Sequence, residues 1–431
     1  MKIAIYLIYA LLPLLSFAQV PGKEGNLEKT IHGFSQERLQ RIDLLLQQYV
    51  DSSWIKGAAA LLIHHGNTVY HKAFGVDRIK PKKSLDKDAI FRIASQTKAI
   101  TSTAVMMLYE EGKFLLDDPI SRYLPSFAKP RVLDKFNEKD STFTTVPAKR
   151  EITIRDLLTH TSGLDYAQIG SPQMQAIYAK AGIIAGFSKT PLLLEPMINK
   201  LGTLPIIHQP GEKFTYSLSI DVLGRLVEVT SGKTLDQFFK TRIFEPLGME
   251  DTYFDLPTEK QHRLVQVYTE DKQTGTVMPW ADNTFPNVSI DYPINHNGLY
   301  AGGAGLVSTL KDYALFLQML LNKGIYNGHR LLSRHTIEIM TKNQIGDLSL
   351  GDDKFGLGFQ ITSSEGNAKL GLSEGSISWG GFFGTTFWAD PREKIIALLF
   401  IQQWPLRHSE LGDKFKVSVY QALLYCRYHQ L

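Results

Sequence analysis

Hydrophobic and polar positions follow patterns that predict regular elements near both ends of the chain. Apolar residues recur at helical spacing over 35–51, 308–321 and 412–425. Strand-like runs bounded by turn residues cover 57–64, 68–74, 356–362, 376–380, 382–389 and 394–401. Because short polar turns join consecutive strands, the pattern predicts an antiparallel sheet flanked by helices, an α/β fold of the α+β type.

The middle of the chain has a different character. Residues 113–300 are rich in prolines and loops, and the helical patterns there are short, at 155–159, 193–201, 220–230 and 235–243. We therefore expect an α/β lobe built from 35–112 and 301–431, and a helical, loop-rich lobe built from 113–300. Binding sites often lie at such interfaces, so a functional cleft is expected between the two lobes.

The stretch 91–112 carries the first candidate chemistry. A short extended piece leads into a helix, and Ser95 and Lys98 lie three residues apart on one face at its start. A serine hydroxyl is a weak nucleophile until a neighbour accepts its proton, and a lysine can do so when burial disfavours its charge. The helix N-terminus also supplies N–H groups for a developing oxyanion.

A structural role for Ser95 has to be weighed against this. A serine before a helix is a common N-cap, and Ser-x-x-Lys also occurs elsewhere in the chain, for example at Ser84, Ser126 and Ser308. Ser308 opens the helical pattern 308–321, and there we interpret the serine as an N-cap. The motif at Ser95 therefore needs support from other segments.

A second segment is Tyr216-Ser217-Leu218, which follows a Pro-Gly turn and precedes a helical pattern. This position can hold the Tyr216 phenol rigidly over a cleft. A cationic Lys98 nearby would favour the phenolate and make Tyr216 a usable base. Without such a neighbour, the segment fits a packed tyrosine whose hydroxyl is paired.

A third segment, Trp379-Gly380-Gly381, lies between two predicted strands. Glycines let the backbone approach a ligand closely. The N–H of Phe382 could then act as an oxyanion donor beside the N–H of Ser95. A turn that carries a tryptophan is the structural alternative.

In the order Ser-x-x-Lys, Tyr-Ser-Leu and Trp-Gly-Gly, the chain resembles the serine β-lactamase/penicillin-binding-protein superfamily, and within its class C-like branch the family VIII carboxylesterases. The segments 157–164 (LLTHTSGL), 302–306 (GGAGL) and 356–358 (GLG) support this. The resemblance implies that Ser95 is acylated, that Lys98 and Tyr216 move its proton, and that the N–H groups of Ser95 and Phe382 form the oxyanion hole. Which of Lys98 and Tyr216 is the formal base stays open.

Two departures from the family pattern bear on the substrate. Leu218 stands where lactam-processing relatives usually carry asparagine, and Trp379-Gly380-Gly381 stands where they carry Lys-Thr-Gly. Losing a hydrogen bond between a cation and a carboxylate costs about 1.5–3 kcal/mol. We therefore expect Leu218, Trp379, Gly380 and Gly381 to form a more apolar substrate-binding mouth that favours neutral short-chain esters.

Two alternatives remain for the function. One is a β-lactamase or D-amino-acid peptidase or amidase that acts on cell-wall-type peptides. The other is a protein that binds acyl ligands or cell-wall fragments without turnover. Retention of Ser95, Lys98 and Tyr216 argues against the second, because binding needs none of them.

A competing nucleophile motif, Gly-x-Ser-x-Gly, occurs at 371–375 around Ser373. Asp390 and His408 follow in the order of an α/β-hydrolase triad. That elbow requires a strand before the serine and a helix after it, whereas strand-like residues follow Ser373. The pattern therefore disfavours this motif.

Composition narrows the partners. The 47 basic and 43 acidic residues give a net charge of +4 that is spread along the chain, which does not indicate nucleic acid. The single cysteine, Cys426, excludes an internal disulfide and a cysteine cluster, and we expect it to be packed. No His-Glu-x-x-His motif occurs, so we expect no metal and no organic cofactor, and a small-molecule ester, amide or lactam as partner. His160 is expected to be structural, bonded to loop backbone.

The first residues predict export. Lys2 precedes an apolar run over 3–17, and Ser16 and Ala18 are small, which is typical of a signal peptide (1–18) cut near Ala18. The run is too short for a transmembrane helix, so no stable membrane span is expected after its removal. We expect a flexible segment at 19–34 and a periplasmic or secreted protein.

Overall fold

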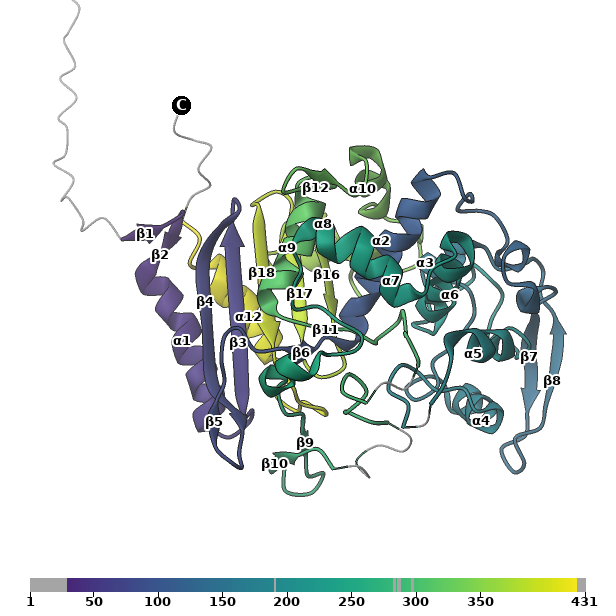
Figure 1. The fold of residues 1–431 in the computed structure, drawn as a ribbon, viewed down its shortest axis with the longest axis horizontal. Helices are drawn as coiled ribbons and strands as arrows, with labels where there is room; N and C mark the ends of the chain where they lie inside the picture. The colour runs from purple at the N-terminus through teal and green to yellow at the C-terminus, as the bar shows by residue number, and fades with distance from the viewer. Residues whose placement is uncertain (1–28, 190, 282–283, 285–287, 296–297, 425–431) are drawn as a thin grey trace, which may run out of the picture.

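An eight-stranded antiparallel sheet forms the centre of the computed structural model, which describes residues 29–424 apart from 190, 282–283, 285–287 and 296–297. The strand order is β14 (Lys354–Phe355), β15 (Gln360–Ile361), β16 (Ile377–Gly380), β17 (Thr386–Asp390), β18 (Ile395–Phe400), β3 (Gly57–His64), β4 (Asn67–Arg78) and β5 (Lys83–Ser84). β18 pairs with β3, so the two ends of the chain share one sheet (Figure 1). This confirms the predicted fold class. The predicted signal peptide and Cys426 lie outside the described residues.

Strand β3 explains why this region is continuously apolar. Ala59 and Leu61 belong to one buried cluster, whereas Ala58 and Ala60 belong to another on the opposite face. Both faces of the strand are therefore covered, and alternation with polar residues is lost. The hairpin to β4 turns at His65 and Gly66, which both have positive φ, as a tight two-residue turn requires.

Helices cover both faces of the sheet. α1 (Gln36–Asp51) and α12 (Leu411–Tyr420) pack against each other on one face, and α9 (Leu310–Leu321) packs against β3 and β18 on the other. α2 (Thr97–Glu110) lies between this second layer and α6 (Ser219–Ser231) (Figure 1). α2 is thus the element that joins the sheet to the helical region.

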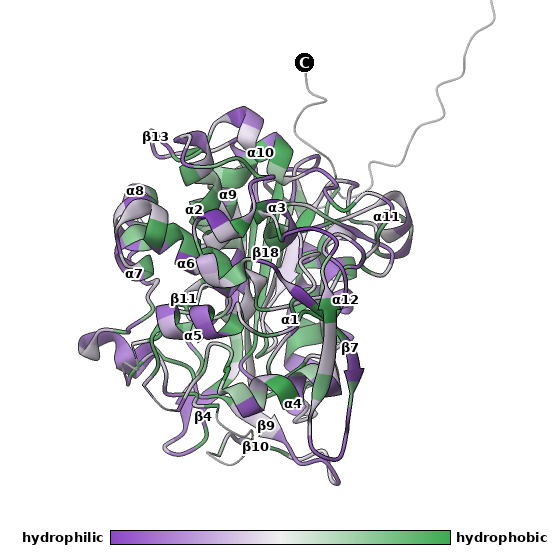
Figure 2. Cartoon of the chain, turned by 90° about the vertical axis from the view of Figure 1, so that its right-hand side faces the viewer, coloured by the Kyte–Doolittle hydropathy of each residue, from purple (hydrophilic) through white to green (hydrophobic). Residues whose placement is uncertain are grey.

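The helical region contains more strand than we predicted. Its helices are α3 (Ile154–Leu158), α4 (Pro172–Ala181), α5 (Leu194–Leu201), α6, α7 (Leu235–Phe239) and α8 (Glu245–Leu247). Two hairpins were not predicted: β7 (Arg131–Phe136) with β8 (Phe143–Pro147), and β9 (Tyr268–Glu270) with β10 (Val277–Pro279). β7 carries both charged and apolar residues (Figure 2) and only Val132 in it is buried, so it lacks the buried alternation that a sequence pattern detects.

Several predicted boundaries are wrong. Only Gln360–Ile361 of the expected strand 356–362 is strand, because residues 356–359 form the turn of the β14–β15 hairpin, where Gly358 has a φ of 93°. The expected strand 382–389 begins only at Thr386, because a turn closed by Gly384 N–H on Gly381 O (3.0 Å) precedes it. The α-helix predicted over 235–243 ends at Phe239, and a π-helical turn over Lys240–Phe244 follows it directly.

Two predicted roles near element starts also change. Ser308 belongs to β11 (Val307–Ser308), which pairs with β6 (Phe91–Arg92), and Thr309 caps α9 in its place. Of the segment 19–34, which we expected to be flexible, the structure describes only 29–34, where β1 (Thr30–Ile31) pairs with β2 (Phe34–Ser35). The remaining short elements are β12 (Ile325–Tyr326), β13 (His329–Arg330), α10 (Arg334–Met340) and α11 (Ser364–Leu370).

No helix within the described part of the chain combines the length and the apolar character needed to cross a bilayer.

Candidate active site

Ser95 lies in a single 3₁₀ turn, Ala94–Gln96, between β6 and α2. Ala94 is fully buried and has a φ of 45°, a conformation that non-glycine residues rarely adopt. Such strained positions persist only where the surroundings enforce them. Gln96 occupies the N-cap position of α2 and makes no side-chain cap, so Ser95 is not the cap of this helix.

Lys98 is buried in the first turn of α2 and directs its ammonium at the serine. Its Nζ donates to Ser95 Oγ at 3.3 Å, to Gly303 O at 2.6 Å and to Tyr166 OH at 3.5 Å. It also lies 4.7 Å from the ring centroid of Tyr216 and 5.3 Å from that of Tyr166. Three oxygen acceptors and two aromatic faces form an environment that suits a cation.

Tyr216 lies on the other side of the serine hydroxyl. Its OH donates to Ser95 Oγ at 2.6 Å, and its ring stacks on Tyr166 with centroids 5.4 Å apart. The structure thus brings together the predicted residues Ser95, Lys98 and Tyr216. A group that accepts the Ser95 proton and a group that stabilises the resulting charge are both within reach.

Tyr166 is a site residue that sequence reasoning missed. It follows α3 in a loop, and no motif marks it. Burial, followed by the charges of Tyr216 and Asp221, raises the pKa of Tyr166 well above its ordinary value. Tyr166 therefore stays a neutral phenol that supports Tyr216 by stacking and Lys98 by its oxygen.

His160 packs beneath Tyr216, with ring centroids 4.9 Å apart. Its main-chain carbonyl accepts Thr215 N–H at 2.8 Å, and its ring Nδ1 lies 3.1 Å from Ser217 Oγ, a side chain of the same loop and not the backbone that we expected. Burial, followed by the charge of Lys98, lowers the pKa of His160 well below its ordinary value. The His160 ring is therefore neutral, and it holds the segment that carries Tyr216 in place.

The third motif, Trp379-Gly380-Gly381, lies at the end of β16 and close to the Ser95 site. The Trp379 ring lies 5.5 Å from that of Tyr216 and 5.3 Å from that of Phe355. A Cβ on Gly381 would lie 2.4 Å from the carbonyl oxygen of Ile93, so the end of β16 touches the turn that carries Ser95. Gly381 N–H is bonded to Thr385 O at 2.7 Å, and the amide of Phe382 comes next. Gly380 is exposed at the end of the strand.

Leu218 does not lie where we expected. Its side chain is fully buried in the main hydrophobic cluster, and it occupies the N-cap position of α6. Its N–H donates to Asp165 O at 3.2 Å, which turns the backbone into the helix and the side chain inward. Leu218 therefore supports α6 and does not line the mouth of the site in this structure.

The competing Gly-x-Ser-x-Gly motif has no nucleophile geometry. Ser373 follows α11 and precedes β16, which is the reverse of the required strand–turn–helix order. Ser373 N–H donates to Asp390 Oδ2 at 3.3 Å, and Tyr420 OH donates to the same oxygen at 2.7 Å. His408 stacks on Trp54, 3.9 Å away. These residues are structural.

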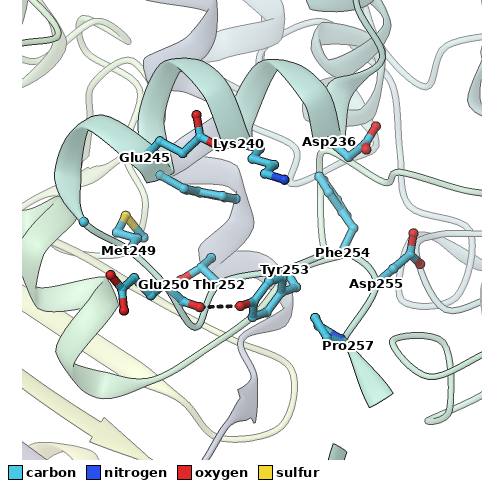
Figure 3. A pocket seen from close by; sticks show the side chains of 12 residues that line it. Asp236, Lys240, Glu245, Met249, Glu250, Thr252, Tyr253, Phe254, Asp255 and Pro257 are labelled. Carbon is cyan, nitrogen blue, oxygen red and sulfur yellow. Dashed lines mark hydrogen bonds between the residues drawn. The ribbon is translucent and has the colours of Figure 1, made fainter. Parts of the chain in front are cut away.

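Figure 3 shows the residues that line a cavity, whose volume is about 600 Å³. Residues from α7, the π-helical turn, α8 and the loop after it line this cavity, among them Phe244, Met249 and Phe254. None of Ser95, Lys98 and Tyr216 lines it. Within the described residues, no group of three or more histidine, cysteine, aspartate or glutamate side chains could hold a metal ion.

Comparison with known proteins identifies the family of this chain. Residues 42–420 match the family described as Beta-lactamase. The chain therefore belongs to the β-lactamase family of serine hydrolases.

Individual relatives point in the same direction. Esterase EstB of Burkholderia gladioli is 27% identical over 81% of this chain and 86% of its own length. Lovastatin esterase of Penicillium rubens is 28% identical over 84% of this chain and 92% of its own length. Among solved structures, EstCE1, described as a hydrolase with promiscuous acyltransferase activity, superposes with a TM-score of 0.77 at 26% identity, over 89% of this chain and 99% of its own.

Proposed function

We propose that this protein is a carboxylesterase that cleaves short-chain esters through an acyl-enzyme on Ser95. The observation that carries the proposal is the placement of one partly exposed hydroxyl, Ser95 Oγ, 2.6 Å from Tyr216 OH and 3.3 Å from Lys98 Nζ. A nucleophile within hydrogen-bond reach of a base, with a further group orienting that base, is the arrangement that acyl transfer needs.

The proposed reaction proceeds in two halves. Tyr216, as phenolate beside the Lys98 ammonium, takes the Ser95 proton while Oγ bonds to the ester carbonyl carbon. The oxyanion is stabilised by the N–H groups of Ser95 and Phe382. As the carbon–oxygen bond breaks, Tyr216 returns the proton to the leaving alcohol. Water then attacks the acyl group, Tyr216 takes its proton, and Ser95 Oγ leaves with that proton, which releases the carboxylic acid.

The walls of the site support an ester over a lactam. Trp379 stands beside Tyr216 where a lactam-processing relative would place a lysine, and an indole cannot pair with a substrate carboxylate. The aromatic side chain of Phe382, stacked on Trp404 with centroids 4.7 Å apart, adds apolar surface next to the proposed oxyanion donor. The names of EstB and lovastatin esterase describe esterases, which agrees with this choice.

Two further proposals concern substrate class and location. Action on a β-lactam or on a D-amino-acid peptide is the alternative for the same nucleophile, since amide and ester cleavage share these steps. The apolar start of the chain supports export through a signal peptide over 1–18 to the periplasm or the medium.

The test is intact-protein mass spectrometry after exposure to a fluorophosphonate, with p-nitrophenyl butyrate and nitrocefin turnover measured in parallel. Ser95→Ala should lose both the adduct and ester turnover, whereas Ser373→Ala, the matched control, should retain both. Faster turnover of nitrocefin than of the ester would reject the ester assignment. An adduct on Ser95 without turnover of either substrate would favour a binding protein.

A further inference from the structure

Asp221 is a buried carboxyl that the reaction above does not use. It lies in the first turn of α6, its side chain is 1% exposed, and α6 packs against the helix that carries Lys98. We propose that Asp221 is a positioning residue and counter-charge that keeps Lys98 cationic and holds its ammonium at Ser95. The inference rests on the proposed function, because it assigns the role of Lys98 within that same site.

One residue, Gly303, connects the Asp221 carboxyl to the Lys98 ammonium. Gly303 N–H donates to Asp221 Oδ1 at 3.0 Å, and Gly303 O accepts from Lys98 Nζ at 2.6 Å. Thr101 Oγ1 donates to the neighbouring Gly302 O at 2.7 Å, which fixes the same loop to α2. Asp221 therefore sets the position of the carbonyl oxygen that makes the shortest contact to the lysine.

Gly303 is required for this arrangement. A Cβ at position 303 would lie 2.3 Å from Asp221 Oδ2, far inside contact distance. The loop can approach the carboxyl only because this residue has no side chain. The close approach brings a charge of opposite sign behind the lysine while both groups stay out of water.

Charge supports the same assignment. Burial raises the pKa of Asp221, and the opposing effects of Lys98 and of the Gly303 N–H limit that rise. The other titratable groups facing this cluster are Tyr166 and His160 from the loop after α3 and Tyr216 from the loop before α6. A buried carboxylate near the ammonium offsets part of the cost of burying that positive charge.

A purely structural role is the alternative. An acidic residue in the first turn of a helix also stabilises the helix through its dipole and its free N–H groups. That role predicts a loss of stability when the charge is removed, but no change in the titration of Lys98. The two roles therefore differ in a property other than stability.

The experiment compares the wild type with Asp221→Asn, which keeps the shape and an acceptor for Gly303 N–H but removes the charge. Removing a negative charge makes every neighbouring proton leave more easily, so the pH profile for labelling of Ser95 by a fluorophosphonate should move to lower pH by about one unit or more. Asp312→Asn is the matched control. Asp312 is also buried, in the first turn of α9, and accepts from Asp251 N–H (2.7 Å) and Thr252 OH (2.9 Å).

A second measurement depends neither on activity nor on the folding of Asp221→Asn. In wild-type protein with ¹³C-labelled lysine, the Cε signal that Lys98→Arg removes should report a protonated ammonium at pH 7. A deprotonated Lys98 at pH 7, or a labelling profile unchanged between Asp221→Asn and the wild type, would overturn the inference. Failure of the wild type to become labelled at Ser95 would reject the proposed function, and the lysine signal would still test whether Lys98 is cationic, as the inference requires.

Discussion

At the scale of residues, two hydrogen bonds to Ser95 Oγ carry unequal weight. The Tyr216 contact is 2.6 Å and the Lys98 contact is 3.3 Å. Lys98 is held more tightly by Gly303 O, at 2.6 Å, than by the serine. This geometry favours Tyr216 as the group that exchanges a proton with Ser95, with Lys98 as the charge beside it.

Tyr216→Phe tests this division directly. Loss of the proton acceptor should lower kcat/KM for p-nitrophenyl butyrate by about 10²–10⁴-fold. Tyr166→Phe is the matched control, because the raised pKa of Tyr166 keeps this phenol from accepting the serine proton and its OH lies 3.5 Å from Lys98 Nζ, so its loss should cost about tenfold or less. Equal losses in the two variants would show that the two phenols act as one unit.

Substitution of Trp379 tests whether this one position sets the preference for esters over lactams. Trp379→Lys restores the cation of lactam-processing relatives and should raise the rate of acylation by nitrocefin about tenfold or more relative to Trp379→Met. Trp379→Met removes the indole without adding charge and so controls for lost bulk. Equal acylation rates in the two variants would rule out the missing cation as the limiting feature.

At the scale of elements, the site depends on where β16 ends relative to the 3₁₀ turn before α2. Helix and strand patterns located α1, the β3–β4 hairpin and the α2 region from local sequence, because those segments have clear periodicity or turn residues. The end of β16 is different. Its strand pattern was visible, but its contact with Ile93 depends on the curvature and pairing of the sheet.

Two adjacent glycines allow this contact to be tested. Gly381→Ala would place a Cβ 2.2 Å from Thr385 Oγ1 and 2.4 Å from Ile93 O, so the strand end must move away from Ser95. Losing one oxyanion donor typically lowers kcat by about 10²–10³-fold, and we expect a loss of that size with little change in KM. At Gly380 the nearest atom to such a Cβ is Thr385 O at 3.4 Å, and Gly380→Ala should retain kcat.

At the scale of the whole molecule, a buried residue of the site also affects the stability of the fold. His160 is 1% exposed and neutral, and burial holds its pKa well below the ordinary value. The unfolded chain takes up a proton at this histidine below a pH of about 6.5, whereas the folded chain does not. The contribution of His160 to the free energy of unfolding is therefore present above that pH and is lost as the pH falls below it.

Denaturant unfolding of the wild type and His160→Asn at several pH values measures this effect. Below pH about 6.5, the wild type should lose about 1.4 kcal/mol of unfolding free energy per pH unit relative to the variant. Above pH 7 the difference between the two proteins should not change with pH. A difference that stays constant across the whole range would mean that His160 titrates normally in the folded state.

The sequence alone determined the fold class and the nucleophile candidate, because both depend on local spacing. Ser95 and Lys98 share a helix face through a separation of three residues, and the strand patterns at both ends predicted one antiparallel sheet. Tertiary structure decided the rest. Tyr216 lies 121 residues from Ser95, Gly303 lies 205 residues from Lys98, and Tyr166 carries no motif. Leu218 turned inward because α6 starts there. Such positions follow from packing between distant segments, chiefly α2 against α6, and local sequence does not encode which side chains that packing brings together.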